Sequence, residues 1–253
     1  MIKTVLSETN TCTDPQDVNA VRIGGIQKQS LIDFPGKVSC VLFLTGCNLN
    51  CPYCHNPALA RGEVPDPQAP NTLEFMDFLR QRRGFLDGVV ISGGEPTLQV
   101  GLLHLCERIR ALGYPIKLDT NGSRPGILAH LLDRGLLDYI AMDVKTHPLL
   151  YRQHVQSHCD PASFIESIRL IIESGIDHEF RTTCIKPIVS PSIIDAIAHL
   201  ISGAKRFVLQ QFRNTEILHP EFFLNNRSHP YSCSELDRLK DIASRQVACC
   251  LVR

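Results

Sequence analysis

The sequence has no excess of charge of either sign, because lysine and arginine together number 26 and aspartate and glutamate also number 26 among its 253 residues. A neutral chain without a basic run creates no field that attracts nucleic acid or an anionic membrane. No uninterrupted apolar stretch approaches the roughly 18 residues that a membrane span requires. The first ten residues also lack the apolar segment of a signal peptide. We therefore expect a cytoplasmic protein with neither a nucleic acid nor a membrane as its partner.

The sequence also lacks a regular framework of disulfide-forming cysteines. Its eleven cysteines, without an export signal, are expected to be reduced thiols. Outside one short segment they are scattered and form no second Cys-x2-Cys pair, which argues against an additional ferredoxin-like cluster. Cys40, Cys106 and Cys184 lie in apolar patterns, so we interpret them as small core residues.

Three cysteines of that short segment, Cys47, Cys51 and Cys54, have the spacing Cys-x3-Cys-x2-Cys, and no fourth cysteine stands nearby. A closed structural zinc site uses four ligands, whereas a four-iron cluster held by three cysteines keeps one iron open for chemistry. The spacing therefore favours an iron–sulfur cluster. The alternatives are a zinc knuckle completed by His55 or a distant residue, and three thiols that are simply buried.

Apolar segments that are typical of buried strands alternate with segments whose apolar residues recur at helical spacing. Strands are predicted over 38–44, 89–91, 115–118, 139–144, 179–185 and 207–212. Asn71 with Glu74, Asp160 with Pro161, and Ser190 with Pro191 are predicted helix starts. Six such units with no hairpin signal between them predict an α/β protein with a parallel sheet. A partial (β/α)6 barrel and an open doubly wound sheet both fit this alternation.

One domain is the expectation for a chain of this length with 43% hydrophobic residues. We predict a polar leader over 1–20, a barrel domain over 21–214 and a C-terminal extension over 215–253. The extension contains a predicted helix over 234–243 and a short apolar end over 247–252. We expect it to pack on the barrel.

Polar residues follow several of the predicted strands, at the end where parallel barrels place their active sites. In the second unit Gly93 and Gly94 allow a ligand to approach the backbone closely, and Glu95 can accept a hydrogen bond from an ammonium group. The other candidates at the strand ends are Ser92, Asp119, Thr120, Asn121, Asp143, Lys145, Arg181, and Gln211 or Arg213. These groups suit a carboxylate, a ribose diol or a monovalent cation.

The cysteine spacing, with Tyr53 just before the third cysteine and Gly-Gly-Glu after the second strand, resembles the radical S-adenosylmethionine (SAM) superfamily. The resemblance implies a partial TIM-like (β/α)6 barrel and one [4Fe–4S] cluster whose open iron is chelated by SAM. It also implies reductive cleavage of SAM to a 5'-deoxyadenosyl radical, so the hard chemistry belongs to the cofactor. The SAM site that we predict contains Tyr53, Ser92, Gly93, Gly94, Glu95, Asp119, Thr120, Asn121, Asp143 and Lys145. Arg181 and Gln211 are added as weaker candidates because of their positions on the fifth and sixth predicted strands.

Residues 23–28, 31–37, 87–98, 117–122 and 141–145 resemble more closely the activating proteins of anaerobic ribonucleoside-triphosphate reductase. The reaction implied is hydrogen abstraction from a glycine of that glycyl-radical enzyme, with a flavodoxin or ferredoxin-type protein as electron donor. The alternatives are a radical SAM enzyme acting on a small molecule, a peptide or another glycyl-radical enzyme. More distant alternatives are an iron–sulfur electron carrier and a zinc-stabilised binding module.

Overall fold

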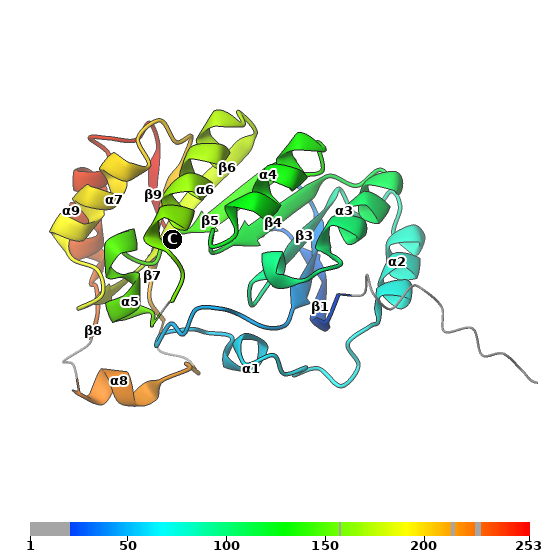
Figure 1. Ribbon diagram of the computed structural model, residues 1–253, viewed down its shortest axis with the longest axis horizontal. Helices are drawn as coiled ribbons and strands as arrows, with labels where there is room; N and C mark the ends of the chain where they lie inside the picture. The colour runs from blue at the N-terminus through cyan, green and yellow to red at the C-terminus, as the bar shows by residue number, and fades with distance from the viewer. Residues whose placement is uncertain (1–20, 157, 214–215, 226–228) are drawn as a thin grey trace, which may run out of the picture.

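The computed structural model describes residues 21–156, 158–213, 216–225 and 229–253 (Figure 1). The predicted polar leader over 1–20 lies outside the described residues. No helix in the described part of the chain is both long and apolar enough to cross a membrane. The domain boundaries given above stay predictions.

Six strands pair in parallel, each with the next one along the chain, and form the body of a single sheet. They are β2 (Ser39–Leu44), β3 (Gly88–Gly93), β4 (Ile116–Thr120), β5 (Tyr139–Asp143), β6 (Asp177–Lys186) and β7 (Phe207–Gln211). A doubly wound sheet reverses its strand order at a switch point, and this sheet does not. The prediction of a partial TIM-like barrel is confirmed, and the open doubly wound alternative is wrong.

The outer face of this curved sheet is covered by α2 (Thr72–Gln81), α3 (Leu102–Ala111), α4 (Pro125–Asp133), α6 (Pro161–Glu173), α7 (Pro191–Leu200) and α9 (Cys233–Ala243) (Figure 1). The short helices α1 (Pro57–Ala60) and α8 (Pro220–Asn225) lie apart from this face, below the sheet in Figure 1. The connections also contain α5 (Tyr151–His154) and the 3-10 turns η2 (Pro96–Leu98) and η3 (Pro148–Leu150). The predicted caps are present. Asn71 and Glu74 form a capping box, and the side chains of Asp160 and Ser190 accept hydrogen bonds from the first turns of α6 and α7.

The two faces of the sheet carry different side chains because successive residues of a strand point to opposite faces. The outer face and the helices share the large apolar core, in which Cys40, Cys106 and Cys184 are fully buried, as predicted. The inner face has only a small apolar cluster, formed by Phe34, Val41, Val90, Tyr139 and Ala141 with Phe43 against it. Val208 is a further apolar residue on this face, where it pairs with Arg181. Most of the other inward positions are polar or charged, and they lead toward the carboxyl ends of the strands.

One further strand extends the sheet at each edge, and the strand at the N-terminal edge was not predicted from the sequence. Strand β1 (Ile23–Ser30) pairs antiparallel with β2, and its middle residues Gln27, Lys28 and Gln29 are exposed, so it carries no continuous apolar run. At the other edge, β9 (Cys250–Val252) pairs in parallel with β7. The apolar end of the chain therefore joins the sheet itself. The two-residue β8 (His229–Pro230) pairs with β6.

The turn after β3 packs directly against the start of the cysteine segment. Gly94 N donates to Leu44 O at 2.8 Å, and Glu95 N donates to Gly46 O at 2.7 Å. A Cβ atom on Gly94 would lie 2.1 Å from Gly46 O, far inside van der Waals contact. Only glycine allows the two backbones to approach this closely.

We predict that Gly94→Ala lowers the free energy of unfolding by about 1 to 3 kcal/mol, the usual range for an overpacked site. The added methyl group must push the cysteine segment away from the end of β3. Thermal unfolding of the metal-free protein measures this effect. Gly126→Ala is the matched control, because Gly126 lies in α4 with open space around it, and alanine there should be neutral or stabilising. Equal stability of the two variants would contradict the prediction.

Candidate active site

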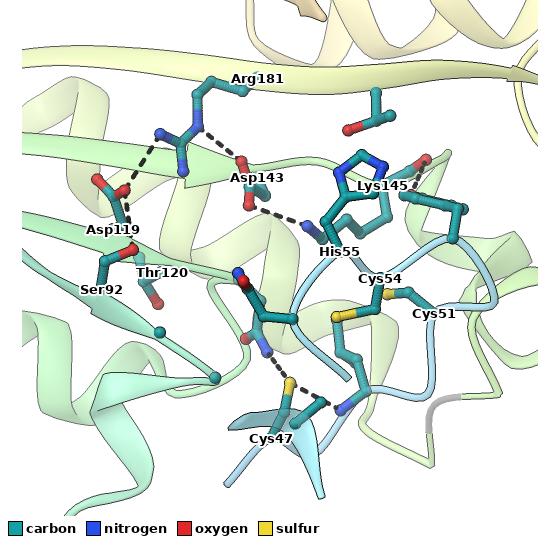
Figure 2. A pocket seen from close by; sticks show the side chains of 18 of the residues that line it. Cys47, Cys51, Cys54, His55, Ser92, Asp119, Thr120, Asp143, Lys145 and Arg181 are labelled. Carbon is teal, nitrogen blue, oxygen red and sulfur yellow. Dashed lines mark hydrogen bonds and ion pairs between the residues drawn. The ribbon is translucent and has the colours of Figure 1, made fainter. Parts of the chain in front are cut away.

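A pocket of about 240 Å³ opens at the carboxyl ends of the parallel strands and collects most of the predicted site residues (Figure 2). Every parallel strand from β3 to β7, as well as the cysteine segment after β2, contributes to its wall. The wall residues that the sequence singled out are Cys47, Cys51, Tyr53, Cys54, His55, Ser92, Gly93, Gly94, Asp119, Thr120, Asn121, Asp143, Lys145 and Arg181. Most of the polar residues that were predicted at the carboxyl ends of the strands therefore line this one pocket.

The three cysteines of the Cys-x3-Cys-x2-Cys segment all line this pocket. The segment is held by backbone hydrogen bonds from Gly46 N to Leu59 O at 2.7 Å and from Cys47 N to Ala60 O at 3.1 Å. Burial raises the pKa of the Cys47 thiol, and it raises the pKa of the Cys51 thiol to about 12. Because a metal-bound cysteine is a thiolate, metal binding here would release protons.

The donor set fits a four-iron cluster held by three protein ligands. Cys47, Cys51 and Cys54 all line the pocket, and each thiolate of such a cluster binds its own iron. A closed zinc site would need a fourth ligand. His55, the candidate fourth zinc ligand, has Nε2 2.9 Å from Arg213 O and stacks on Phe212 with ring centroids 5.4 Å apart.

A row of alternating charges crosses the pocket floor from β4 to the end of β5 (Figure 2). Arg181 bridges two carboxylates, with Nε 2.7 Å from Asp143 Oδ1 and Nη1 3.3 Å from Asp119 Oδ2. Lys145 Nζ lies 2.9 Å from Asp143 Oδ2. Burial by itself would raise the pKa of both carboxyl groups, but Arg181 and the neighbouring lysines outweigh it and hold both pKa values below the usual range. Both aspartates are therefore ionised at neutral pH.

Lys117 completes this row, and the sequence analysis did not single it out. Its side chain is 2% exposed, and Nζ lies 2.5 Å from Asp119 Oδ1 and 5.9 Å from the centre of the Tyr139 ring. The sequence does indicate this partner, because Lys117 precedes Asp119 by two residues on one strand, and side chains at that spacing share a face. A lysine two residues before a predicted site carboxylate indicates a buried partner for it.

The carboxylate of Glu95 is fully buried, and it is not among the groups that line the pocket. It accepts hydrogen bonds from Thr97 N, Thr97 Oγ1, Thr120 Oγ1 and Asn121 N at 2.5 to 3.1 Å. Its predicted contact with an ammonium group stays a prediction. Burial raises its pKa in spite of these bonds. Glu95 ties the end of β3 to the end of β4 and so positions Thr120 and Asn121.

Asn121 links the strand ends to the cysteine segment. Its Nδ2 donates to Asn48 Oδ1 at 2.9 Å and lies 3.9 Å from Cys47 Sγ. On the other side of the pocket, Ser92 Oγ donates to Asp119 Oδ2 at 3.1 Å. Tyr53 is buried, and its hydroxyl lies 3.5 Å from Lys145 O. Tyr53 therefore connects the cysteine segment to the residues that follow β5.

Gln211, predicted at the end of β7, is not among the residues that line the pocket. Its Nε2 donates to Tyr231 O at 3.2 Å, whereas its neighbour Gln210 lines the pocket. The two residues point to opposite faces because they are adjacent on β7. The role of Gln211 in SAM binding stays a prediction. Arg213, the other candidate there, is exposed and reaches the site only through its backbone carbonyl.

Comparison with known proteins points to the same family as the cysteine spacing and the Gly-Gly-Glu motif. The radical SAM superfamily profile matches residues 41–200. A protein of Methanocaldococcus jannaschii, provisionally named a glycyl-radical enzyme activating enzyme, is 34% identical over 205 residues, which cover 79% of this chain and 83% of that protein. The pyruvate formate-lyase-activating enzyme of Clostridium pasteurianum is 32% identical over 133 residues, covering 49% of this chain and 52% of the enzyme. This chain therefore spans most of the first relative and about half of the second.

Solved structures share the fold at low sequence identity. Streptococcus suis SuiB bound to its precursor peptide SuiA superposes with a TM-score of 0.60 and 20% identity, over 83% of this chain and 48% of SuiB. QueE from Escherichia coli superposes with a TM-score of 0.52 and 14% identity, over 79% of this chain and 87% of QueE. These likenesses support the partial barrel alone. From the profile match, together with the cysteine-lined pocket, we conclude that the chain belongs to the radical SAM superfamily, which implies a [4Fe–4S] cluster and SAM as cofactors.

Proposed function

We propose that this protein is a glycyl-radical enzyme activating enzyme and that its substrate is an anaerobic ribonucleotide reductase. The observation that carries the first part is the match to the Methanocaldococcus jannaschii protein over most of both chains. The second part is supported by the segments 23–37 and 87–98, which resemble the activating proteins of that reductase. A flavodoxin or ferredoxin-type protein would supply the electrons.

Cys47, Cys51 and Cys54 would hold one [4Fe–4S] cluster, since all three line the pocket. The reduced cluster would supply the electron that cleaves bound SAM to methionine and a 5'-deoxyadenosyl radical, and this radical would remove a hydrogen atom from a glycine of the partner, leaving 5'-deoxyadenosine and a glycyl radical. The cationic groups of Lys145 and Arg181 suit the carboxylate of SAM, and Asp119 and Asp143 suit its ribose hydroxyls or amino group. A monovalent cation beside these carboxylates stays part of the proposal.

A second candidate is a radical SAM enzyme that acts on a small molecule. It is favoured by a 32% identity over 130 residues to the 7-carboxy-7-deazaguanine synthase of Methanopyrus kandleri. That match covers only 44% of this chain and 51% of the synthase, so the activase proposal accounts for more of the sequence. The two proposals share the cofactor site and differ in the substrate.

We predict that Cys47→Ala, Cys51→Ala and Cys54→Ala each abolish the cluster after anaerobic reconstitution, because two thiolates are too few to hold it. Iron and sulfide analysis and the brown absorbance of the cluster measure the result. Cys106→Ala is the matched control, since Cys106 is a buried core thiol of α3 that does not line the pocket. A single-cysteine variant that retains four irons per chain would exclude that cysteine as a ligand.

We expect Asp143→Asn to weaken SAM binding at least tenfold while the cluster is retained. The substitution removes a negative charge held between Arg181 and Lys145, and a hydrogen bond to a charged group is usually worth this much. Equilibrium binding of SAM to the reconstituted protein without reductant tests it. Asp241→Asn on the exposed face of α9 should bind SAM normally, and equal affinity of the two variants would remove Asp143 from the site.

The substrate is tested by electron paramagnetic resonance on the anaerobic ribonucleotide reductase of the same organism. The reductase is incubated with this protein, SAM and a reductant, and we expect a glycyl-radical doublet. The doublet should vanish when the radical-forming glycine of the reductase is replaced by alanine. SAM cleavage without any radical on the reductase would overturn the assignment of this substrate.

A further inference from the structure

Two uncharged polar side chains, Thr183 on β6 and Gln210 on β7, line the pocket next to the charged row. They are direct partners in the register of these two strands. Thr183 also shares its face with Arg181 and lies two residues, about 6.6 Å, nearer the carboxyl end of β6. The two side chains therefore lie next to each other, nearer the carboxyl ends of the strands and the opening of the pocket than the charged residues do.

Neither of these side chains forms a hydrogen bond within the part of the chain that the structure describes. The neighbouring polar groups of the pocket are engaged: Arg181 with two carboxylates, Lys145 with Asp143, and Ser92 with Asp119. Thr183 and Gln210 are half-buried, so an incoming molecule can reach them at little cost in desolvation. They are donors and acceptors that the fold itself does not use.

Their chemistry complements a peptide main chain. The glutamine amide offers one acceptor oxygen and two N–H donors, and the threonine hydroxyl offers one of each kind. Side chains on adjacent strands are about 4.8 Å apart, which lets the pair contact both the N–H and the C=O of an extended segment. The pair carries no charge, and a charged substrate group would find no counterion there.

The position of the pair fits a segment that enters from outside the barrel. Strand β7 is the last of the consecutive parallel strands, and only the short β9 follows it in the described sheet. The two edge strands β1 and β9 are not paired with each other, so the barrel is unclosed on this side (Figure 1). A loop that enters here passes β9 and then meets β7 and β6 before it reaches the charged residues at the base of the pocket.

We propose that Gln210 and Thr183 bind the main chain of the glycine-containing loop of the partner protein and hold its glycine toward the SAM site. This inference rests on the proposed function, and it adds the residues that recognise the substrate. Recognition through main-chain groups suits glycine, which offers no side chain to contact. The role proposed for Gln210 differs from the one predicted for Gln211, which was a contact with SAM.

The test is the affinity of the reconstituted protein for a fluorescent peptide that spans the radical-forming glycine of the reductase. Anisotropy is measured with SAM present and reductant absent, so binding is read without turnover. We expect Gln210→Ala to weaken peptide binding about five- to tenfold, the value of one or two neutral hydrogen bonds, while SAM affinity stays within twofold. Gln211→Ala is the matched control, because that side chain bonds Tyr231 O outside the pocket.

A second measurement distinguishes the loss of a main-chain contact from a folding defect of the Gln210→Ala variant. A peptide whose glycine nitrogen is methylated lacks one main-chain donor and should bind the wild-type protein more weakly. If Gln210 accepts from that N–H, the methyl group should cost much less affinity in Gln210→Ala, as expected for a coupled pair. Thr183→Val should weaken peptide binding in the same direction, and Thr183→Ser should restore it.

The outcomes separate this inference from the proposed function. A wild-type protein that cleaves SAM but forms no glycyl radical overturns the proposed function, and the inference falls with it. A wild-type protein that forms the radical, with equal peptide affinity in Gln210→Ala and Gln211→Ala, overturns the inference alone. Loss of SAM affinity in Gln210→Ala with unchanged peptide affinity also overturns it, because Gln210 would then contact the cofactor.

Discussion

The guanidinium of Arg181, held between Asp119 and Asp143, is the interaction on which the rest of the site depends. It joins three neighbouring strands, β4, β5 and β6, at the level where the pocket begins. The Arg181 side chain is only 13% exposed, and those of the two aspartates are 15% and 25% exposed. Removing one member of such a buried group leaves an uncompensated charge, which typically costs about 3 to 5 kcal/mol. The strand ends are therefore fixed in the arrangement that faces the cofactors.

The same row explains why the inside of this barrel differs from its outside. A closed eight-stranded barrel fills its interior with layers of branched apolar side chains, whereas here the apolar inner cluster is small and lies beneath the charges. Lys117 is buried under Asp119, and farther from the pocket the buried Glu179 pairs with the partly exposed Arg206 and Arg253. Lys117 and Glu179 each have an opposite charge within reach, whereas the buried carboxylate of Glu95 is stabilised by uncharged hydrogen-bond donors. The interior is thus polar along much of its depth.

The cysteine segment, in contrast, is held by backbone contacts with parts of the chain that are distant in sequence. Gly94 and Glu95 pack against Leu44 and Gly46 on one side, and Leu218 N donates to Cys54 O at 3.1 Å on the other. Glu95 connects these contacts to β4 through Thr120 and Asn121. Three thiols on a short loop would otherwise be free to spread apart. A rigid frame keeps them on one wall of the pocket, opposite the charged row.

Local signals in the sequence determined the helix starts, the six parallel strands and the grouping of three thiols. The caps at Asn71, Asp160 and Ser190 depend only on neighbouring residues, and apolar periodicity reports burial directly. Tertiary structure decided the strand order, the pairing of β1, and the direction in which individual site residues point. Gln210 faces the pocket instead of Gln211 because the pleat of β7 is set by its register with β6. Glu95 turns inward because donors from β4, distant in sequence, surround its carboxylate. These outcomes depend on contacts between distant segments, which no local pattern in a single sequence encodes.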